Sequence, residues 1–455
     1  MGTLLYIPAR EIVERNPLIY RISLSTPLTT VSVPHQESSD YGFNYVVDWG
    51  DRSPSQSVNS YNDGNSTHIY AESGEYEISI LGICESFVPT ADPTIIDVLA
   101  WGDVGLKLLG FMYCPYLNSI PEGPITGASQ VTSCAYMFYG CLSLGYIEPH
   151  MFDLMPNVTS FMATFPSEFA YVWITSIPEG LFDNNPLAEN FYYTFGGTHI
   201  VSIPEHLFDN CPLARDFSQC FVSTHITSIP VEIFKYNTLA ENFNTTFGGC
   251  LSLPSIPEDL FIYNTNVKTF EGTFSGCTLL TTAPVGLFRN CPLVTSFYEI
   301  FFYCNHLSII PEDIFKYNVN VTIFALAFEG DTALIDIPEK LFKNNTLVTD
   351  MGDTFANCSL VASIPSELFL YNTLVESFTQ CFYYCTGILS IPDSLFDSNL
   401  LVTTFSECFS HCTGLTGSSI HLWTRIPVPS GGNCYTSDIG LSDYAIIPNL
   451  WKGVF

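Results

Sequence analysis

A proline recurs at a nearly constant interval over more than half of this chain. It stands at steps of 26 or 27 residues from Pro178 to Pro392, and looser copies precede the series at Pro121 and Pro149. A fixed period of roughly 20–50 residues is typical of arrays in which each unit stacks on its neighbours. The 455-residue chain is therefore expected to contain ten to eleven stacked repeats instead of one compact core.

Three phenylalanine positions keep a fixed distance from this proline, at four, thirteen and seventeen residues after it. In the repeat of Pro257 they are Phe261, Phe270 and Phe274. A single unit cannot bury its own apolar face, whereas stacked units join equivalent side chains into continuous columns. Burial of each phenylalanine stabilises the fold by roughly 1.5–3 kcal/mol, so we predict that these columns form the core.

The residues around the proline predict one strand and short helical turns in each repeat. The residue before a proline is pushed toward extended geometry, so the run 360–364 indicates a short strand that ends at Pro365. Proline suits the first position of a helix, and the glutamate that follows several of these prolines suits a helix N-terminus. We therefore expect an α/β solenoid. An asparagine seven residues after most of the prolines favours a turn there.

Cysteine dominates the position twenty residues after the proline, but Thr198, Thr224 and Asp331 replace it in other repeats. The chain has 16 cysteines, whose placement follows the repeat and not a pairing scheme. A disulfide framework would not tolerate these replacements. We therefore interpret most of the cysteines as reduced core residues.

The N-terminal part has a different pattern. Residues 46–80 alternate apolar and polar side chains between turn clusters, which is typical of a small antiparallel β-sandwich. For Asp48 and Asp51, turn formation is a more economical interpretation than calcium binding. The recurring motifs are Trp-Gly-Asp at 49–51, His-Ile-Tyr at 68–70 and Gly-Glu-Tyr at 74–76.

These motifs resemble two known families. The run Thr-Phe-Ser-Gly-Cys at 273–277, which leads to Ile-Pro-Glu-x-Leu-Phe in neighbouring repeats, is similar to the BspA-like leucine-rich repeats of bacterial surface proteins, including those of gut bacteria and their phages. The resemblance covers about residues 95–455 and implies a right-handed solenoid with a role in adhesion or partner binding. The N-terminal motifs resemble PKD-type Ig-like domains, which implies a spacer or a protein-contact module.

The expected organisation is thus multidomain, with an all-β sandwich followed by the solenoid. Trp423 and Trp451 are expected to lie in the C-terminal cap, because an open end of a solenoid exposes its core. The predicted segments are an N-terminal arm at 1–17, a PKD-like sandwich at 18–85, a linker and N-terminal cap at 86–120, a leucine-rich-repeat solenoid at 121–412 and a C-terminal cap at 413–455.

The formal net charge of −31 repels phosphate backbones, and no Lys/Arg cluster reverses it locally, so nucleic acid is not expected as a partner. No apolar stretch is long enough to span a membrane, and the N-terminal residues lack the features of an export signal. We therefore expect display on a virion surface, with a bacterial cell surface or an extracellular location as the alternative if a signal peptide was removed.

No motif predicts catalysis, a metal or a cofactor. The nine histidines show no metal-binding spacing, and no phosphate loop or nucleophile elbow occurs. Packing is also a better explanation than a zinc site for the thiols of two neighbouring repeats, because they belong to inward columns. These thiols are Cys381, Cys385, Cys408 and Cys412.

If the protein binds a ligand, we expect the contacts between the second and third phenylalanine columns, where the residues vary from repeat to repeat and exposed tyrosines can anchor a partner. Ordinary packing between turns is the alternative role of these tyrosines. The candidate ligand surface is Tyr192, Tyr193, Tyr298, Tyr383 and Tyr384. The leading hypothesis is a non-enzymatic recognition or adhesion protein of a phage virion. Its expected partners are a protein or a glycan on the host surface, and other proteins of the virion. The alternatives are a bacterial BspA-like adhesin and a purely structural cementing protein of a virion. Association of the chain into a homo-oligomer is left undecided.

Overall fold

The computed structural model describes residues 15–166 and 173–453. Most of the predicted N-terminal arm therefore lies outside the described residues. The chain divides into two compact units. The first unit is Met1–Ile200 with His206–Ala214, and the second unit is Val201–Glu205 with Arg215–Phe455.

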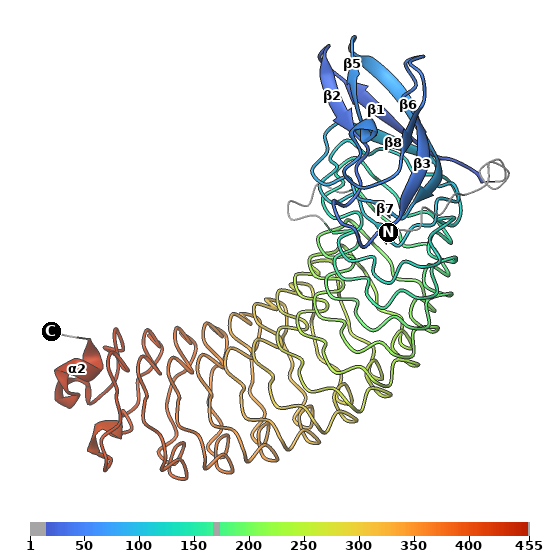
Figure 1. The fold of residues 1–455 in the computed structure, drawn as a ribbon. Helices are drawn as coiled ribbons and strands as arrows, with labels where there is room; N and C mark the ends of the chain where they lie inside the picture. Colours follow the sequence, from blue (N-terminus) through green and yellow to red (C-terminus); the bar gives the residue numbers. More distant parts are fainter. Residues whose placement is uncertain (1–14, 167–172, 454–455) are drawn as a thin grey trace. The chain divides into compact units, whose positions relative to one another are not determined.

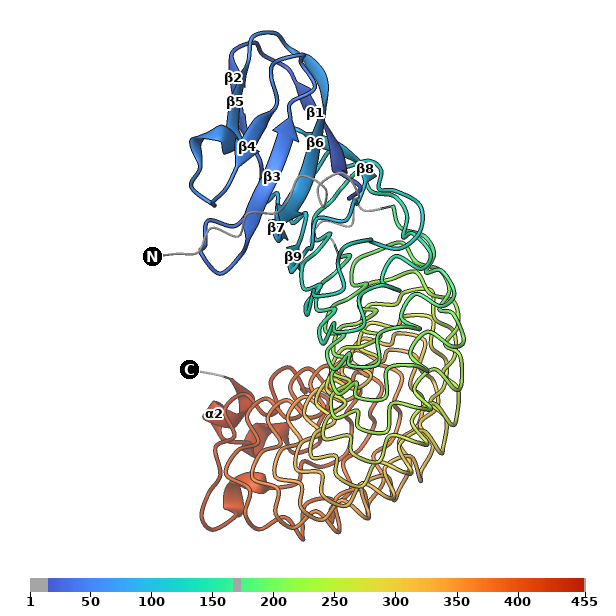
Figure 2. The ribbon, with the colours of Figure 1, turned by 45° about the vertical axis from the view of Figure 1, so that its right-hand side comes forward.

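The strands of the structure belong to the first unit (Figures 1 and 2). They are β1 (Leu18–Leu24), β2 (Thr29–Ser32), β3 (Phe43–Asp48), β4 (Gln56–Val58), β5 (Thr67–Tyr70), β6 (Gly74–Cys84), β7 (Ser86–Phe87), β8 (Ile95–Ala100) and β9 (Leu108–Leu109). The helical elements are short, namely the 3₁₀ turns η1 (Gly64–Ser66), η2 (Leu422–Thr424) and η3 (Tyr444–Ile446) and the helix α2 (Asn449–Lys452).

The N-terminal module is all-β because its strands alternate buried and more exposed residues. An antiparallel sheet has the strand order β4-β3-β6-β1-β8, and β2 pairs with β5 in a second sheet. The Trp49 side chain is fully buried, its Nε1 donates to Gln56 (2.6 Å), and the Tyr70 hydroxyl donates to the Trp49 carbonyl (2.7 Å). β8 lies in the stretch 86–120, for which the sequence predicts a linker and cap, and it extends the sheet of this module.

The repeats of the second unit follow one another as successive coils (Figure 1). They are joined by isolated parallel β-bridges at the residue that lies twelve positions after the repeat proline, as in Thr269 to Ser296 and Ser296 to Ile323. A strand before the proline was predicted, but the run 360–364 has no strand. Among the described residues of the second unit, Thr282 and Ile309 are the pair that forms a bridge in that part of a repeat. The row of β-bridges lies instead in a stretch without proline. Because proline has no backbone N–H, every residue of that stretch can donate a hydrogen bond to a neighbouring repeat.

The helical turns predicted after the proline are also wrong for the described residues. The N–H of Leu368 donates to the Pro365 carbonyl (3.3 Å), and the N–H of Asn372 donates to the Phe369 carbonyl (3.1 Å). These bonds reach back three residues and form separate turns. A helix confined to these few residues would not recover the cost of forming its first turn. The solenoid is therefore built from turns and bridges, and the α/β assignment is wrong.

The phenylalanine columns do form the core. The Phe274 side chain is fully buried and stacks between Phe247 (ring centroids 5.8 Å) and Phe301 (6.0 Å). In the first unit the Phe111 ring stacks on that of Phe138 at 5.6 Å and an interplanar angle of 0°. The stacked column thus already includes Phe111, a residue of the predicted linker and cap.

A further column, in addition to the three phenylalanine columns, consists of buried asparagines whose side chains bind backbone carbonyls of the preceding repeat. Nδ2 of Asn399 donates to the carbonyls of Phe369 (3.2 Å) and Asn372 (2.8 Å), and the same pair of bonds recurs in earlier repeats. Arg425 ends this column, since its Nη2 donates to the carbonyls of Phe396 (3.0 Å) and Asn399 (2.9 Å). The guanidinium thus takes the place of one further asparagine.

The cysteines are all reduced and buried, as predicted for most of them. In the inward cysteine column, Sγ of Cys277 lies 3.2 Å from the Phe247 carbonyl, and Sγ of Cys304 lies 3.1 Å from the Phe274 carbonyl. Burial raises the pKa of these two thiols well above its ordinary value. Thiols that stay protonated in the core are poor nucleophiles and poor disulfide partners.

We therefore expect reducing agent to leave the thermal stability of the protein unchanged. Differential scanning calorimetry with and without dithiothreitol measures this directly. Because no disulfide constrains the unfolded chain, the two melting temperatures should agree within about 1 °C. A drop of several degrees on reduction would show that the cysteines pair.

The C-terminal end of the second unit is covered by aromatic side chains. The Tyr435 ring continues the stack of Phe409 (5.9 Å, 8°), and the Trp451 indole of α2 stacks over Tyr435 (6.5 Å, 26°). Trp423 packs edge-on against both Tyr435 and Trp451. These contacts cover the last rung of the column and are the arrangement expected of a cap.

Candidate functional site

One surface of the second unit is set by the bridged stretch of each repeat, and we call it the ladder face. Its backbone runs from the bridge residue to a position seven residues later. Three side chains of each stretch point into the core, and the remaining ones form the face. The stretches are 216–223, 242–249, 269–276, 296–303, 323–330, 350–357, 377–384 and 404–411.

Hydrogen bonds between successive repeats hold this backbone in register. The N–H groups of Glu299 and Tyr303 donate to carbonyls of the next repeat, Ala325 (3.2 Å) and Glu329 (2.6 Å). The same alternate residues donate in each of the following repeats. Side chains of the face therefore stand at fixed positions on a rigid backbone, which suits a binding surface.

Two positions of each stretch adopt left-handed backbone geometry. At the last position of the stretch, Gly249, Gly276 and Gly330 have φ of 69°, 69° and 79°. Tyr303 (φ 56°) and Tyr384 (φ 57°) occupy this same position. A left-handed conformation costs a residue with a side chain roughly 1–3 kcal/mol, whereas glycine adopts it freely. Ser223, Asn357 and His411 also occupy this position, so five of the eight stretches hold a side chain where glycine would avoid the strain.

The aromatic side chains at these positions are exposed but held in place. Tyr303 is 43% exposed and packs on Phe302 (ring centroids 4.5 Å), and a Cβ on Gly330 of the next repeat would lie 2.8 Å from its ring. Tyr384 is 40% exposed and stacks on His411 (4.3 Å, 4°). Ordered aromatic rings lose little conformational entropy when a partner binds, which favours tight contacts.

Carboxylates accompany the aromatic rings. Burial raises the pKa of Tyr298 to about 12, and the neighbouring Glu299 carboxylate contributes to the shift. Burial also raises the pKa of Glu329 to about 7 and that of Asp353 to about 6, and each carboxylate is surrounded by others. Glu407 accepts a hydrogen bond from Nε2 of Gln380 (3.0 Å) beside the Tyr383 ring, whose pKa is raised by burial and then by Tyr384 and Glu407.

The predicted tyrosines divide between the two units. Tyr192 and Tyr193 lie half-buried in the first unit, with their rings 6.1 Å apart. Three others lie on the ladder face of the second unit, where Tyr383 and Tyr384 contact each other edge-on (4.6 Å). Five further residues of the face were not predicted from the sequence. Two of them, Tyr303 and His411, stand at the same repeat position as Tyr384, and this shared position is the signal in the sequence that points to them. These added residues are Phe302, Tyr303, His411, Glu329 and Asp353.

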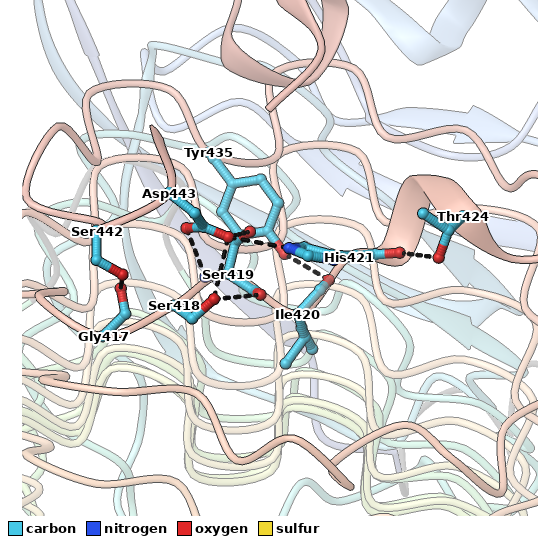
Figure 3. Close-up of polar contacts among 9 residues, drawn as sticks. All are labelled: Gly417, Ser418, Ser419, Ile420, His421, Thr424, Tyr435, Ser442 and Asp443. Carbon is cyan, nitrogen blue, oxygen red and sulfur yellow. Dashed lines mark hydrogen bonds and ion pairs between the residues drawn. The ribbon is translucent and has the colours of Figure 1, made fainter. Parts of the chain in front are cut away.

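A polar cluster at the C-terminal cap combines serine, histidine and aspartate, but its geometry does not fit a catalytic triad (Figure 3). Oδ2 of Asp443 accepts from Ser419 Oγ (2.6 Å) and lies 3.1 Å from His421 Nε2. Because the serine and the histidine meet the same carboxylate oxygen, the histidine is not placed between them as the base of the serine. Burial opposes ionisation of Asp443, yet the bonds from Ser419, Ser418 and His421 hold its pKa below the ordinary value.

Among the described residues, no group of three or more histidine, cysteine or acidic side chains is arranged to hold a metal ion. Asp48 and Asp51 accept bonds from the N–H groups of Gly50 (3.0 Å) and Ser53 (2.9 Å), as expected of turn-forming residues. The second oxygen of Asp51 lies 2.7 Å from Nε2 of His68. Within the described ranges, no helix is sufficiently long and apolar to cross a membrane.

The bridges, the stacked columns and the repeat period together define a solenoid of the leucine-rich-repeat type. No protein-family model matches the chain, and no curated protein matches it. Among solved structures, the Toll chain of the Drosophila Toll–Spatzle complex is similar at a TM-score of 0.44 and 16% identity, over 69% of this chain and 39% of that chain. The TLR13 chain of a complex with ssRNA13 is similar at a TM-score of 0.22 and 12% identity, over 68% of this chain and 54% of that chain. Similarities this low do not extend to a shared function.

Proposed function

We propose that this chain is a non-catalytic recognition protein that binds a protein partner through the ladder face of its second unit. The observation that carries the proposal is the exposure of two ordered tyrosines, Tyr303 and Tyr384, at a left-handed position where three of the other stretches have glycine. Left-handed backbone geometry at residues other than glycine carries strain, and such strain is typical of functional positions. Exposed, ordered tyrosines are also the side chains that most often anchor protein interfaces.

The solenoid supplies the scaffold for this role. Its core of stacked phenylalanines is independent of the face, so surface residues vary between repeats without loss of the fold. The finer parts of the proposal rest on the resemblance to BspA-like surface proteins. They are adhesion, display on a virion or on a bacterial surface, and the purely structural alternative. Mass spectrometry of purified virions tests the virion location.

A site-specific photo-crosslinker tests the recognition role. We expect that benzoylphenylalanine in place of Tyr303 or Tyr384 forms a discrete adduct with a protein from the native source of the chain. Tyr317 is the matched control position, because it is 54% exposed in the same unit but lies outside the ladder face. Equal adducts at the face and at Tyr317, or none at the face, would contradict the proposal.

The protein captured at the face then allows a quantitative test. The double variant Tyr303→Gly with Tyr384→Gly should bind that partner at least about tenfold more weakly, as expected when interface anchors are removed. Its free energy of unfolding should stay within about 1 kcal/mol of the wild type, because relief of left-handed strain offsets the lost ring contacts. Unchanged affinity in the folded double variant would exclude these tyrosines as anchors.

A further inference from the structure

Charge is segregated on the second unit. The eight stretches of the ladder face contain no lysine or arginine. Their acidic residues are Asp216, Glu271, Glu299, Glu329, Asp350, Asp353 and Glu407. They stand at several different positions of six of the eight stretches but on the same face, so their fields add in the same region of space.

These carboxylates lack cationic partners. Within the part of the chain that the structure describes, no lysine or arginine forms an ion pair with any of them. After burial, the charge of Asp353 is the largest influence that raises the pKa of Glu329, and the charges of Asp350 and Glu407 raise the pKa of Asp353. The acidic residues therefore repel one another on a half-buried surface, and a neutralising partner would lower this energy.

The cations of the second unit lie elsewhere and are largely occupied. The ammonium of Lys235 pairs with Glu232 (3.0 Å), and that of Lys316 pairs with Asp313 (3.0 Å). The guanidinium of Arg289 pairs with Asp259 (2.6 Å). With 14 lysines and arginines against 45 acidic residues, a second copy of this chain is a poor counterpart for the face. The partner must therefore bring its own cations.

Resting on the proposed function, we infer that the partner presents a lysine- or arginine-rich protein segment that lies along the ladder face of the second unit. Cationic side chains pair with the row of carboxylates, and arginine or lysine also binds the faces of exposed tyrosine rings. An extended segment advances by roughly 3.3 Å per residue, and bridged strands lie roughly 4.8 Å apart. A segment with cations at most of its positions thus meets several repeats at once.

The aromatic residues distinguish this face from a simple acidic patch. Tyr298 lies beside Glu299, and Tyr383 lies beside Glu407, so that a ring and a carboxylate stand together at two places on the face. A cation that lies between a ring and a carboxylate is attracted both by the ring face and by the negative charge. Burial of the ring edge reduces the screening of this charge attraction by water. The same arrangement repels phosphate and sulfate groups, which disfavours nucleic acid and anionic glycans.

Fluorescence anisotropy with defined peptides tests this inference. The probes are labelled peptides of ten arginines, ten lysines and ten glutamates, and the protein is the full chain at about 150 mM salt, where distant charges are screened. We expect the basic peptides to bind and the acidic peptide not to bind. A face variant that combines Glu299→Gln, Glu329→Gln and Asp353→Asn should bind the arginine peptide at least about tenfold more weakly.

A charge-matched control separates the face from the net charge of the chain. The control variant combines Glu258→Gln, Glu312→Gln and Glu339→Gln, which are exposed glutamates next to the repeat proline in the same unit. Its affinity should change by less than about threefold, because these positions lie outside the ladder face. Equal losses in the two variants would overturn the inference, since binding would then follow total charge alone.

The pH dependence gives an independent readout. Protonation of Glu329 and Asp353 removes charge from the face, so the wild type should bind the arginine peptide more tightly at pH 8 than at pH 5.5. The face variant should lose most of this dependence. If the crosslinker at Tyr303 captures a partner but the basic peptides do not bind, the inference about partner chemistry fails while the recognition role stands. If the crosslinker captures nothing and the basic peptides do not bind, both fail.

Discussion

The substitution Phe274→Ala is expected to destabilise the second unit by about 3–5 kcal/mol, the usual cost of emptying a phenylalanine site in a core. The ring is fully buried and stacks on Phe247 and Phe301, and it also contacts Phe261 of the first phenylalanine column (6.4 Å). Removal leaves a cavity that the neighbouring repeats cannot fill, because the register of the ladder fixes their backbones. Adjacent repeats should therefore open together.

Chemical denaturation and hydrogen exchange measure this effect. The transition midpoint should fall, and amides of the repeats on both sides of residue 274 should lose protection. Phe302→Ala is the control, because Phe302 lies half-exposed on the ladder face and its loss should cost less than about 1 kcal/mol. A Phe274→Ala protein that melts like the wild type would show that the columns are not the core.

The substitution Asp331→Cys is expected to stabilise the protein by about 1–3 kcal/mol at pH 7, the usual cost of a buried polar group without a partner. Asp331 takes the place of cysteine in the inward column and is fully buried. Its carboxyl oxygens have no hydrogen-bond partner of normal geometry among the described residues. Burial raises its pKa well above the ordinary value, although the Cys304 backbone opposes the shift. Cysteine restores the side chain that most of the other repeats use.

The gain should depend on pH in a defined direction. The folded state holds the proton of Asp331, whereas the unfolded chain releases it near pH 4, so this residue destabilises the fold increasingly as the pH rises from about 4 toward the raised folded-state pKa. The difference in unfolding free energy between Asp331→Cys and the wild type should thus grow from pH 4 to pH 8. Asp336→Asn, at an exposed neighbouring position, should show no such trend. A constant difference would contradict the buried-acid explanation.

The sequence predicts the core of this fold well and its backbone poorly. The phenylalanine columns follow from the repeat alone, because stacking equivalent residues is the one way to bury all of them. The strand before Pro365 and the helical turns after it were inferred from local preferences. The structure has no strand at 360–364, and separate hydrogen-bonded turns follow the proline. Each segment is too short for its intrinsic helix or strand propensity to determine its conformation. The hydrogen bonds between repeats determine the backbone conformation instead.

The candidate site is predictable in part for the same reason. Tyr298 stands out as a variable residue between the second and third phenylalanine columns, and Tyr383 and Tyr384 directly follow the third. Tyr303 shares its position with Tyr384, but the left-handed geometry that makes both notable is visible only in the backbone. The carboxylate group is also hidden in the sequence, since Glu329 and Asp353 belong to different repeats and different positions and meet only after stacking.

Arg425 stands at the end of the asparagine column and satisfies the last two carbonyls with a single guanidinium. Such a terminator makes the length of the array independent of its ends. Duplication of any 27-residue unit upstream of Arg425 would leave every carbonyl of the column bonded and would add one rung to the ladder face. The length of the ladder face can therefore change by gene duplication alone, without a new cap.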